Sequence, residues 1–287
     1  MRRRAEHLEM QCVILVGGLG TRLGSLTSDC PKPMLQVGGR PFVEQLIRNA
    51  ARFGFTKFLL LAGYRGEVVA AHFADGTIHT PSGKVRVEVV IESEPRGTGG
   101  ALAFAANRLA PHFLMLNGDS LFRFNLLDLV TRPGFEKRLG RLALRRVPDA
   151  TRYGVVKIAR DGQITAMRER PPEPGPGEIN GGVYWLDRRI LELIPAEGFV
   201  SLEREVFPAA IARGALDACR YEGAFLDIGV PDDYAAACDM DFERRPAVFF
   251  DRDGVLNHDA GYMHRVDDLH WIDGAIEAVR CVNDADL

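Results

Sequence analysis

Short apolar segments that alternate with amphipathic segments constrain the fold of this chain more than any other feature. The apolar segments are almost continuously Val, Ile, Leu or Phe, as strands covered on both faces should be. They span residues 12–16, 58–62, 85–91, 113–116, 155–158 and 183–186. Residues 41–53, 98–109 and 201–212 have helical spacing or begin with a Thr or Ser suited to cap a helix. This order predicts an α/β fold with a Rossmann-like, doubly wound, mostly parallel sheet.

The middle of the chain departs from this alternation. Residues 141–147, 154–158 and 164–167, joined by the Asp161-Gly162 turn, predict strands of a small β-hairpin region beside the sheet. Residues 171–177 consist of Pro, Gly and a Glu, which neither a helix nor a central strand accommodates. We therefore expect a loop there.

A second break, near residues 243–246, predicts a domain boundary. The chain has 287 residues, more than one average domain needs. A helix expected at 232–241 is followed by the apolar run 247–250, which predicts a new strand that leads into Asp251-Arg252-Asp253-Gly254. We place one domain at residues 11–244 and a second, short piece at residues 246–287.

Charge and cysteine usage exclude several classes of protein. Lys and Arg total 36 against 39 Asp and Glu, so the net charge of −3 gives no field to attract nucleic acid. The five cysteines have no paired spacing, which predicts reduced thiols and a cytoplasmic protein. The first ten residues lack the pattern of a secretory signal, and no apolar run approaches the roughly 18 residues of a membrane span. We expect neither a nucleic-acid nor a membrane partner.

A glycine-rich turn, Gly17-Gly18-Leu19-Gly20-Thr21-Arg22-Leu23, follows the first predicted strand. Its backbone N–H groups can approach a polyphosphate closely, and Arg22 can donate to phosphate oxygens. It lacks the Gly-Lys-Ser/Thr ending of a P-loop and the third small residue of a dinucleotide fingerprint. Lys32, held between two prolines, adds a fixed positive charge beside the same phosphates. The alternative is a plain turn with a solvated lysine.

These two motifs together resemble the signature of the sugar-1-phosphate nucleotidyltransferases, and the likeness covers most of residues 11–240. The resemblance implies a GT-A-like nucleotidyltransferase fold with Arg22 and Lys32 as catalytic cations. It also implies nucleotide contacts along the first strand and the turn after it. These contacts are Leu15, Gly17, Gly18, Gly20 and Thr21.

Two aspartates each follow a segment that ends the apolar pattern. Asp119 lies in Asn117-Gly118-Asp119, and Asp227 lies in Leu226-Asp227-Ile228-Gly229. An Asp just past a parallel strand lies at the edge of the sheet where ligands bind, although an Asp beside Gly is also common in turns. In the family pattern both positions match metal-holding aspartates, so the resemblance implies Mg²⁺ at Asp119 and Asp227.

The segment from Glu92 to Gly100 joins a strand to an Ala-rich helix, and the resemblance places it against the nucleobase, with contacts from Gly97 and Thr98. A carboxylate suits guanine because N1–H and the N2 amine are adjacent donors. We assign that carboxylate to Glu92, with Glu94 second. The alternative is that both are surface charges beside a turn.

The resemblance also implies sugar-phosphate contacts from a set of residues in the second half of the domain. These are Tyr153, Gly154, Glu169, Arg170, Asn180 and Glu203. Arg170 stands where the family usually has Lys, which keeps the charge but needs more room. Within the family, the motifs are most similar to those of guanylyltransferases acting on D-glycero-D-manno-heptose 1-phosphate, except that Arg96 stands where Leu is usual.

Residues 250–257 resemble the first motif of haloacid dehalogenase (HAD)-type phosphatases. That resemblance implies Asp251 as the phosphoryl-accepting nucleophile, Asp253 as the general acid/base, and Mg²⁺ bound by both. The later Ser/Thr, Lys and acidic pair of the family do not follow before Leu287. We expect no phosphatase activity and interpret residues 246–287 as the start of a HAD-type α/β domain in a longer bifunctional chain. Such a fusion favours a heptose substrate, because the phosphatase would make the sugar 1-phosphate that the transferase consumes.

These observations predict an enzyme that transfers GMP from GTP to heptose 1-phosphate with Mg²⁺ and without a covalent intermediate. A mannose or other hexose 1-phosphate guanylyltransferase is one alternative. A non-catalytic sensor of sugar nucleotides, built on a degenerate copy of the fold, is another. The sequence leaves the oligomeric state open, a homo-oligomer included.

Overall fold

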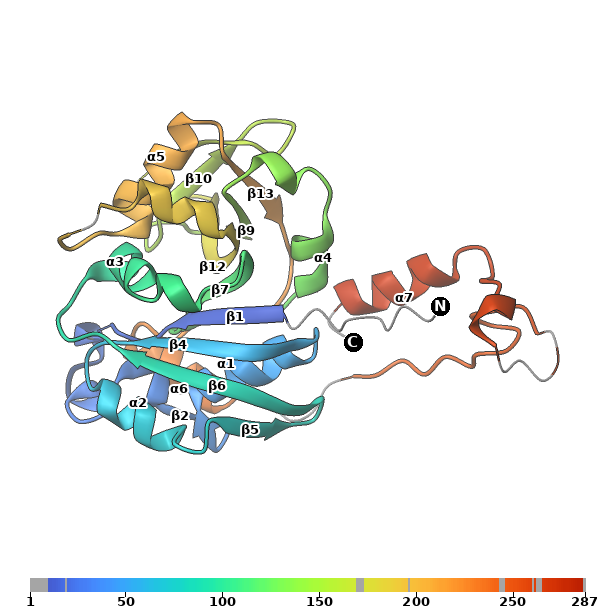
Figure 1. Ribbon diagram of the computed structural model, residues 1–287, viewed down its shortest axis with the longest axis horizontal. Helices are drawn as coiled ribbons and strands as arrows, with labels where there is room; N and C mark the ends of the chain where they lie inside the picture. The colour runs from blue at the N-terminus through green and yellow to red at the C-terminus, as the bar shows by residue number, and fades with distance from the viewer. Residues whose placement is uncertain are drawn as a thin grey trace.

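The structure, a computed structural model, describes residues 10–18, 20–168, 173–195, 197–242, 246–259, 261 and 265–285. Four parallel strands form its centre. They lie in the order β7, β1, β4, β6 (Figure 1). Their bounds are β1 (Met10–Leu15), β4 (Phe55–Ala62), β6 (Gly83–Ile91) and β7 (His112–Asn117). The parallel centre predicted from the apolar segments is confirmed.

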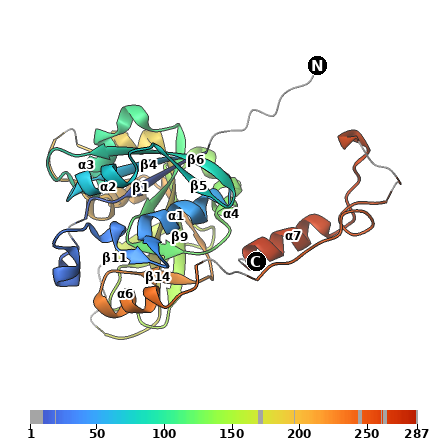
Figure 2. The same ribbon diagram turned by 90° about the horizontal axis from the view of Figure 1, so that it is seen from below.

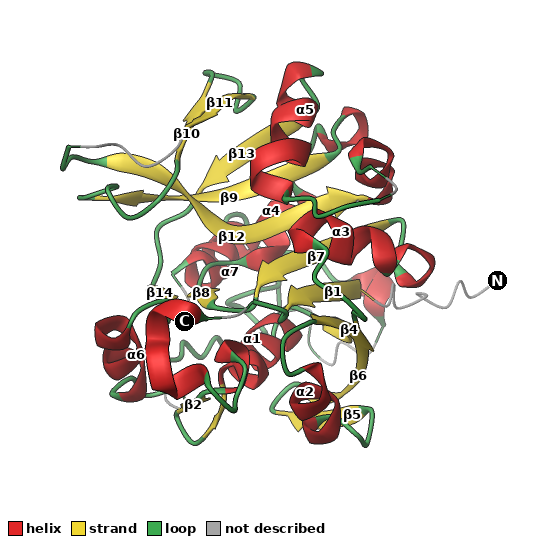
Figure 3. Cartoon of the chain, turned by 90° about the vertical axis from the view of Figure 1, so that its left-hand side faces the viewer, coloured by secondary structure: helices red, strands yellow, loops and turns green. Residues whose placement is uncertain are grey.

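Antiparallel strands extend the sheet on both sides (Figure 3). On one side β5 (Thr77–Thr80) pairs with β6. On the other, β12 (Gly177–Asp187) pairs with β7 and contacts β10 (Val155–Ile158), which forms a hairpin with β11 (Ile164–Arg168). Gly162 in the connecting turn has φ 86°, in the left-handed region that suits glycine.

The expectation that residues 141–147 belong to the same hairpin group is wrong. This segment is β9 (Gly140–Val147), which pairs with β12 on one side and with β13 (Leu216–Arg220) on the other. Leu142, Ala143 and Leu144 are fully buried, so both faces of β9 are covered. Both partners of β9 lie far along the chain, so local turn signals could not indicate them.

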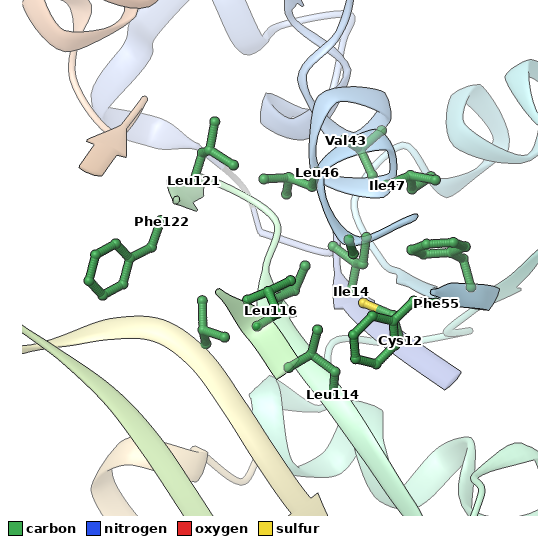
Figure 4. Close-up of a cluster of buried hydrophobic side chains, with 14 of the residues drawn as sticks. Cys12, Ile14, Val43, Leu46, Ile47, Phe55, Leu114, Leu116, Leu121 and Phe122 are labelled. Atoms are coloured by element: carbon green, nitrogen blue, oxygen red, sulfur yellow. The ribbon is translucent and has the colours of Figure 1, made fainter. Parts of the chain in front are cut away.

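Helices cover both faces of the sheet, as a doubly wound fold requires. Cys12 and Ile14 of β1 belong to one apolar cluster, and Val13 between them belongs to another on the opposite face. Figure 4 shows the first cluster, in which Leu46 and Ile47 of the helix α1 (Phe42–Ala51) lie together with Ile14 of β1. The period of two along the strand and the apolar stripe of the helix therefore meet in one core.

The remaining helices of the main body divide between these two faces. Residues of α2 (Gly66–His72), α4 (Leu126–Thr131) and α6 (Pro231–Cys238) join the first cluster. Residues of α3 (Gly97–Phe104) and α5 (Phe207–Ala212) join the second, and a π-helical turn, η6 (Leu202–Val206), leads into α5. Ser201 caps this turn through a hydrogen bond from Arg204 N, as its position predicts. The cap expected from Thr98 is absent, because α3 begins at Gly97.

Short elements carry the loops at the carboxyl ends of the strands. Two 3₁₀ helices, η1 (Thr21–Thr27) and η2 (Lys32–Met34), follow the glycine-rich turn, and a small ladder of β2 (Gln36–Val37) and β3 (Arg40–Pro41) leads into α1. A separate two-stranded ladder joins β8 (Ser120–Phe122) to β14 (Phe225–Asp227). It brings together two segments that lie about a hundred residues apart in the sequence.

The predicted strand at residues 247–250 is wrong. These residues have no strand partner among the described segments, and the Phe249 side chain is 93% exposed. A strand is stable only when its N–H and C=O groups pair with a neighbour. Figures 1 and 2 show this C-terminal segment extending away from the main body and returning through α7 (Ala275–Asp284).

The end of α7 contacts α4 through two polar pairs. Asn125 Nδ2 donates to Asp284 Oδ1 at 2.9 Å, and the Arg280 guanidinium pairs with Asp128.

Within the described ranges, none of the helices is both long and apolar enough to cross a bilayer.

Candidate active site

Lys32, Asp119 and Asp227 form one cluster at the carboxyl edge of the sheet. Lys32 Nζ lies 2.7 Å from Asp119 Oδ2 and 3.9 Å from Asp227 Oδ1. Lys32 is almost fully buried, so it is not a solvated loop residue. The side chain of Asp119 is 40% exposed, so the cluster opens to solvent on that side.

The backbone holds the two aspartates beside each other. Asp227 pairs with Ser120 in the β8–β14 ladder, and Ile228 N donates to the carbonyl oxygen of Asp119 at 3.0 Å. Gly118 N donates to Leu15 O at 2.9 Å, which ties the same turn to the end of β1. A Cβ at Gly118 would overlap that carbonyl oxygen, so the turn requires glycine.

Arg22 reaches the same cluster from η1. A Cβ built at Gly229 would lie 2.7 Å from Asp227 Oδ1 and 3.3 Å from an Arg22 guanidinium nitrogen, so both side chains border Gly229. Gly20, just before η1, has φ 64° and is close to the Lys32 side chain. The turn between β1 and η2 thus delivers two cations to two carboxylates.

The charges within the cluster oppose one another. Burial raises the pKa of Asp227, and the negative charge of Asp119 raises it further, whereas Lys32 and Arg22 act in the opposite direction. Two close carboxylates that repel each other are the donor set that a hard divalent cation relieves. Among the described residues no group of three or more His, Cys, Asp or Glu is placed to hold a metal, so substrate oxygens would have to complete its coordination.

A cleft of about 560 Å³ lies between the glycine-rich turn and the first turn of α3. Its wall includes Gly17, Glu92, Gly97 and Thr98, which the resemblance implies as nucleotide contacts. Glu94, the second choice for the base, also lies on it. An added Cβ at Gly18 would have no described atom within 4 Å, so its backbone faces open space. Thr21 is the first residue of η1.

Glu92 is a half-buried carboxylate in the wall of this cleft. Burial raises the pKa of its carboxyl group to about 7, and the Arg96 guanidinium acts in the opposite direction. Glu92 Oε1 is buried and has no hydrogen-bond partner within the described part of the chain. Oε2 packs against Gly63, where an added Cβ would lie 3.2 Å away. An ionisable acceptor, Oε1, is therefore held in the wall of the cleft without a donor from the described residues.

The residues implied as sugar contacts lie in several environments. Tyr153 packs edge-on against Phe225, two residues before Asp227. Gly154 precedes β10, and an added Cβ there would lie 3.1 Å from Arg168 O. Glu169 and Arg170 lie outside the described residues, so their predicted sugar-phosphate contacts stay predictions.

Asn180 and Glu203 already have protein partners. Asn180 Nδ2 donates to Tyr184 OH at 2.8 Å, and its Oδ1 accepts from Gly182 N at 3.0 Å. Glu203 Oε2 accepts from the hydroxyls of Thr98 at 3.2 Å and Ser201 at 3.3 Å. The Asn180 bonds lie within β12, whereas the bond from Thr98 to Glu203 connects the turn η6 to the base-side turn.

Some residues of the site were not anticipated from the sequence. Asn117 Oδ1 is buried without a hydrogen-bond partner in the described ranges, directly before the Gly118-Asp119 turn. Phe199, Ser201 and Arg204 also line the cleft, from the segment that leads into η6 and from η6 itself. Asn117 could have been found, because it belongs to the same short motif as Asp119. No sequence signal indicates Phe199.

Asp251 and Asp253 lie in the C-terminal segment and are engaged locally. Asp251 Oδ1 accepts from Arg252 N at 2.8 Å, and Asp253 pairs with the Arg252 guanidinium at 2.9 Å. Asp253 also accepts from Asn257 Nδ2 at 3.1 Å. These contacts lie within residues 251–257, and Ile272 N also donates to Leu256 O at 3.0 Å, which ties the loop to the residues before α7.

Comparison with known proteins places the chain among nucleotidyl transferases, since residues 11–243 match the Nucleotidyl transferase family. It is 35% identical over 229 residues to a mannose-1-phosphate guanylyltransferase of Mycobacterium tuberculosis, covering 79% of this chain and 63% of that protein. It is 33% identical over 228 residues to the D-glycero-alpha-D-manno-heptose 1-phosphate guanylyltransferase of Campylobacter jejuni, covering 78% of this chain and 97% of that protein. The crystal structure of HddC from Yersinia pseudotuberculosis complexed with GMP-PN matches with a TM-score of 0.70 and 31% identity, covering 80% of this chain and 98% of that one.

Proposed function

This chain belongs to the nucleotidyl transferase family, and we propose that it transfers GMP from GTP to a sugar 1-phosphate and releases pyrophosphate. The observation that carries this proposal is the cluster of Lys32, Asp119 and Asp227, with Nζ 2.7 Å from one carboxylate and 3.9 Å from the other. It lies beside the glycine-rich turn, where a triphosphate can approach the backbone.

The chemistry requires positive charge at this place. A phosphate oxygen of the sugar must attack the α-phosphorus of the nucleotide in line, so two anions must approach each other. Lys32 and Arg22 reduce that repulsion, and their fixed positions avoid reorganisation during the reaction. Mg²⁺ held by Asp119 and Asp227, when bound, would supply further charge neutralisation for the phosphates. No protein nucleophile is required.

Glu92 supports guanine as the base. Its buried Oε1, which lacks a partner among the residues that the structure describes, can accept from the N1–H or N2 amine of guanine, and adenine offers no such pair of donors. The HddC structure, which contains GMP-PN, agrees with this choice for that relative. Two similar proteins, one acting on mannose 1-phosphate and one on heptose 1-phosphate, carry the name of guanylyltransferase.

We propose heptose 1-phosphate rather than mannose 1-phosphate as the acceptor. The chain spans 97% of the Campylobacter heptose enzyme but only 63% of the mycobacterial mannose enzyme. Identity of 33% and 35% does not separate the two, so mannose 1-phosphate stays the alternative. The presence of Arg22, Lys32, Asp119 and Asp227 together argues against a non-catalytic sensor.

We also propose that residues 246–287 belong to a HAD-type phosphatase domain. Support comes from the Asp251-Arg252-Asp253-Gly254 loop after the apolar residues 247–250. Residues 255–287 contain no Ser, Thr or Lys, which such a phosphatase needs after its first motif. We expect no release of phosphate from a heptose bisphosphate by this polypeptide, and measurable release would overturn that expectation.

We propose that the protein is located in the cytoplasm, which its five free cysteines support.

The decisive experiment measures pyrophosphate release by the purified chain with Mg²⁺. It compares GTP, ATP, UTP, CTP and dTTP, each with heptose 1-phosphate of either anomer, mannose 1-phosphate or glucose 1-phosphate. We expect the highest kcat/KM for GTP with a heptose 1-phosphate. A preference for mannose 1-phosphate would favour the alternative substrate, and tight binding of a GDP-sugar without turnover with any pair would favour the sensor.

Lys32→Met and Lys84→Met provide the control for this assay. Both replace a lysine with an apolar side chain of similar length, but Lys32 is buried beside the two carboxylates and Lys84 is exposed on β6. We expect Lys32→Met to lose at least a hundredfold in kcat. Lys84→Met should retain the wild-type rate, which shows that the loss is specific to position 32, and the loss in Lys32→Met excludes a contaminating activity.

A further inference from the structure

The aromatic ring of Phe199 lies on the wall of the cleft that contains Glu92. Its side chain is 69% exposed, whereas Val200 and Leu202, which follow it, are almost fully buried. A single exposed apolar side chain is common on protein surfaces and indicates nothing by itself. Phe199 differs because it combines exposure with a position in the proposed nucleotide cleft.

Hydrogen bonds fix the segment that carries Phe199 against the first turn of α3. Val200 N donates to Arg96 O and Gly99 N donates to Val200 O, each at 2.8 Å. Leu202 N donates to the Thr98 hydroxyl at 2.8 Å, and that hydroxyl donates to Glu203. The backbone that follows the ring is therefore held in place, although the ring itself is largely exposed.

Gly97 provides the close approach on which this arrangement depends. Its φ is 73°, and a Cβ there would overlap Val200 O and lie 3.1 Å from Phe199 Cε1. The absence of a side chain at Gly97 lets the two segments touch. The ring of Phe199 is consequently placed next to the turn that the nucleotide would contact.

We propose that Phe199 stacks on the face of the nucleobase while Glu92 binds its edge. This inference rests on the proposed function, because it assumes that a nucleotide occupies the cleft. Every base has a π-face, so stacking on an aromatic ring strengthens binding with little dependence on which base it is. Glu92 would provide the selectivity and Phe199 the affinity that all nucleoside triphosphates share.

The test measures equilibrium binding of GTP, ATP and inorganic tripolyphosphate to the full chain and its variants. Phe199→Ala should weaken GTP and ATP by a similar factor, about 5- to 100-fold, and leave tripolyphosphate unchanged, because tripolyphosphate has no base to stack. Phe199→Tyr should bind all three as the wild type does. Phe249→Ala, which removes a phenyl ring that is 93% exposed in the C-terminal segment, should also have no effect.

Each outcome has a distinct meaning. If the wild type binds GTP and Phe199→Ala binds it equally well, the stacking role is overturned and the proposed function stands. If Phe199→Ala weakens tripolyphosphate as much as GTP, the loss comes from a displaced loop, and stacking is again overturned. If the wild type binds none of the three ligands, the proposed function fails and this inference fails with it.

Discussion

The backbone amide of Ile228 donates a hydrogen bond to the carbonyl oxygen of Asp119 at 3.0 Å. This bond continues the β8–β14 ladder by one residue and fixes the separation of the Asp119 and Asp227 backbones through main-chain contacts. A change confined to either carboxylate therefore alters the charge of the site and leaves its framework in place. The two functions of these residues, folding and chemistry, can be separated by experiment.

Asp119→Asn and Asp227→Asn should each lower kcat by about two to three orders of magnitude, because each removes a negative charge that positions a cation at the phosphates. The melting temperature should change by only a few degrees, since the ladder is retained. Activity and the Mg²⁺ concentration for half-maximal rate are measured together. Asp75→Asn, an exposed aspartate far along the chain from both, serves as the control. A variant of Asp227 with wild-type kcat and unchanged Mg²⁺ dependence would contradict the assignment.

The raised pKa of Glu92 predicts a pH dependence of GTP binding. In the free protein this carboxyl group has a pKa of about 7, so it holds its proton below that pH. The N–H groups of guanine need a hydrogen-bond acceptor, and the ionised carboxylate is a better acceptor than the protonated carboxyl group. GTP affinity should therefore fall by about tenfold between pH 8 and pH 6. Protonation of the triphosphate contributes to this fall as well, and the control must remove that contribution.

Glu92→Gln is that control. It cannot ionise, so its remaining pH dependence reports the triphosphate alone, and the difference between the two proteins reports Glu92. Glu92 also affects the free energy of unfolding. A carboxyl group whose pKa is higher in the folded than in the unfolded chain lowers stability at pH values above its unfolded pKa. Glu92→Gln should therefore stabilise the free protein at pH 8 and not at pH 4. Identical pH profiles for both proteins would exclude Glu92 from the base site.

The sequence was sufficient for features that depend on local patterns. The strands β1, β4, β6 and β7 were predicted because two-sided burial leaves continuous apolar runs, and Asp119 and Asp227 were found because each belongs to a short motif. Pairings between distant segments were not predictable, as β9 with β13 illustrates. The contact of Phe199 with the Gly97 turn and the Glu203 bond to Thr98 belong to the same class. They depend on loops that meet only in the folded chain.

Two glycines of the site should separate folding from binding. Gly118→Ala places a Cβ on Leu15 O and should weaken the Gly118–Leu15 hydrogen bond, so both stability and kcat should fall. Gly18→Ala meets no described atom within 4 Å, so its melting temperature should match the wild type, while KM for GTP should rise because phosphates approach the backbone there. Wild-type KM in Gly18→Ala would show that the phosphates bind elsewhere.

Arg141 and Asp217 form a buried ion pair that should govern stability without touching the active site. Two parallel hydrogen bonds of 2.8 Å join them across β9 and β13, and Arg141 is only 2% exposed. Asp217→Asn leaves the guanidinium charge buried without its counter-ion, which should cost about 3 kcal/mol in urea unfolding. The matched control is Glu88→Gln at the exposed Arg108–Glu88 pair, whose distance is 2.7 Å and whose loss should cost under about 1 kcal/mol. Equal costs for the two variants would mean that burial of the pair does not determine its contribution, and that β13 is held to β9 by its backbone alone.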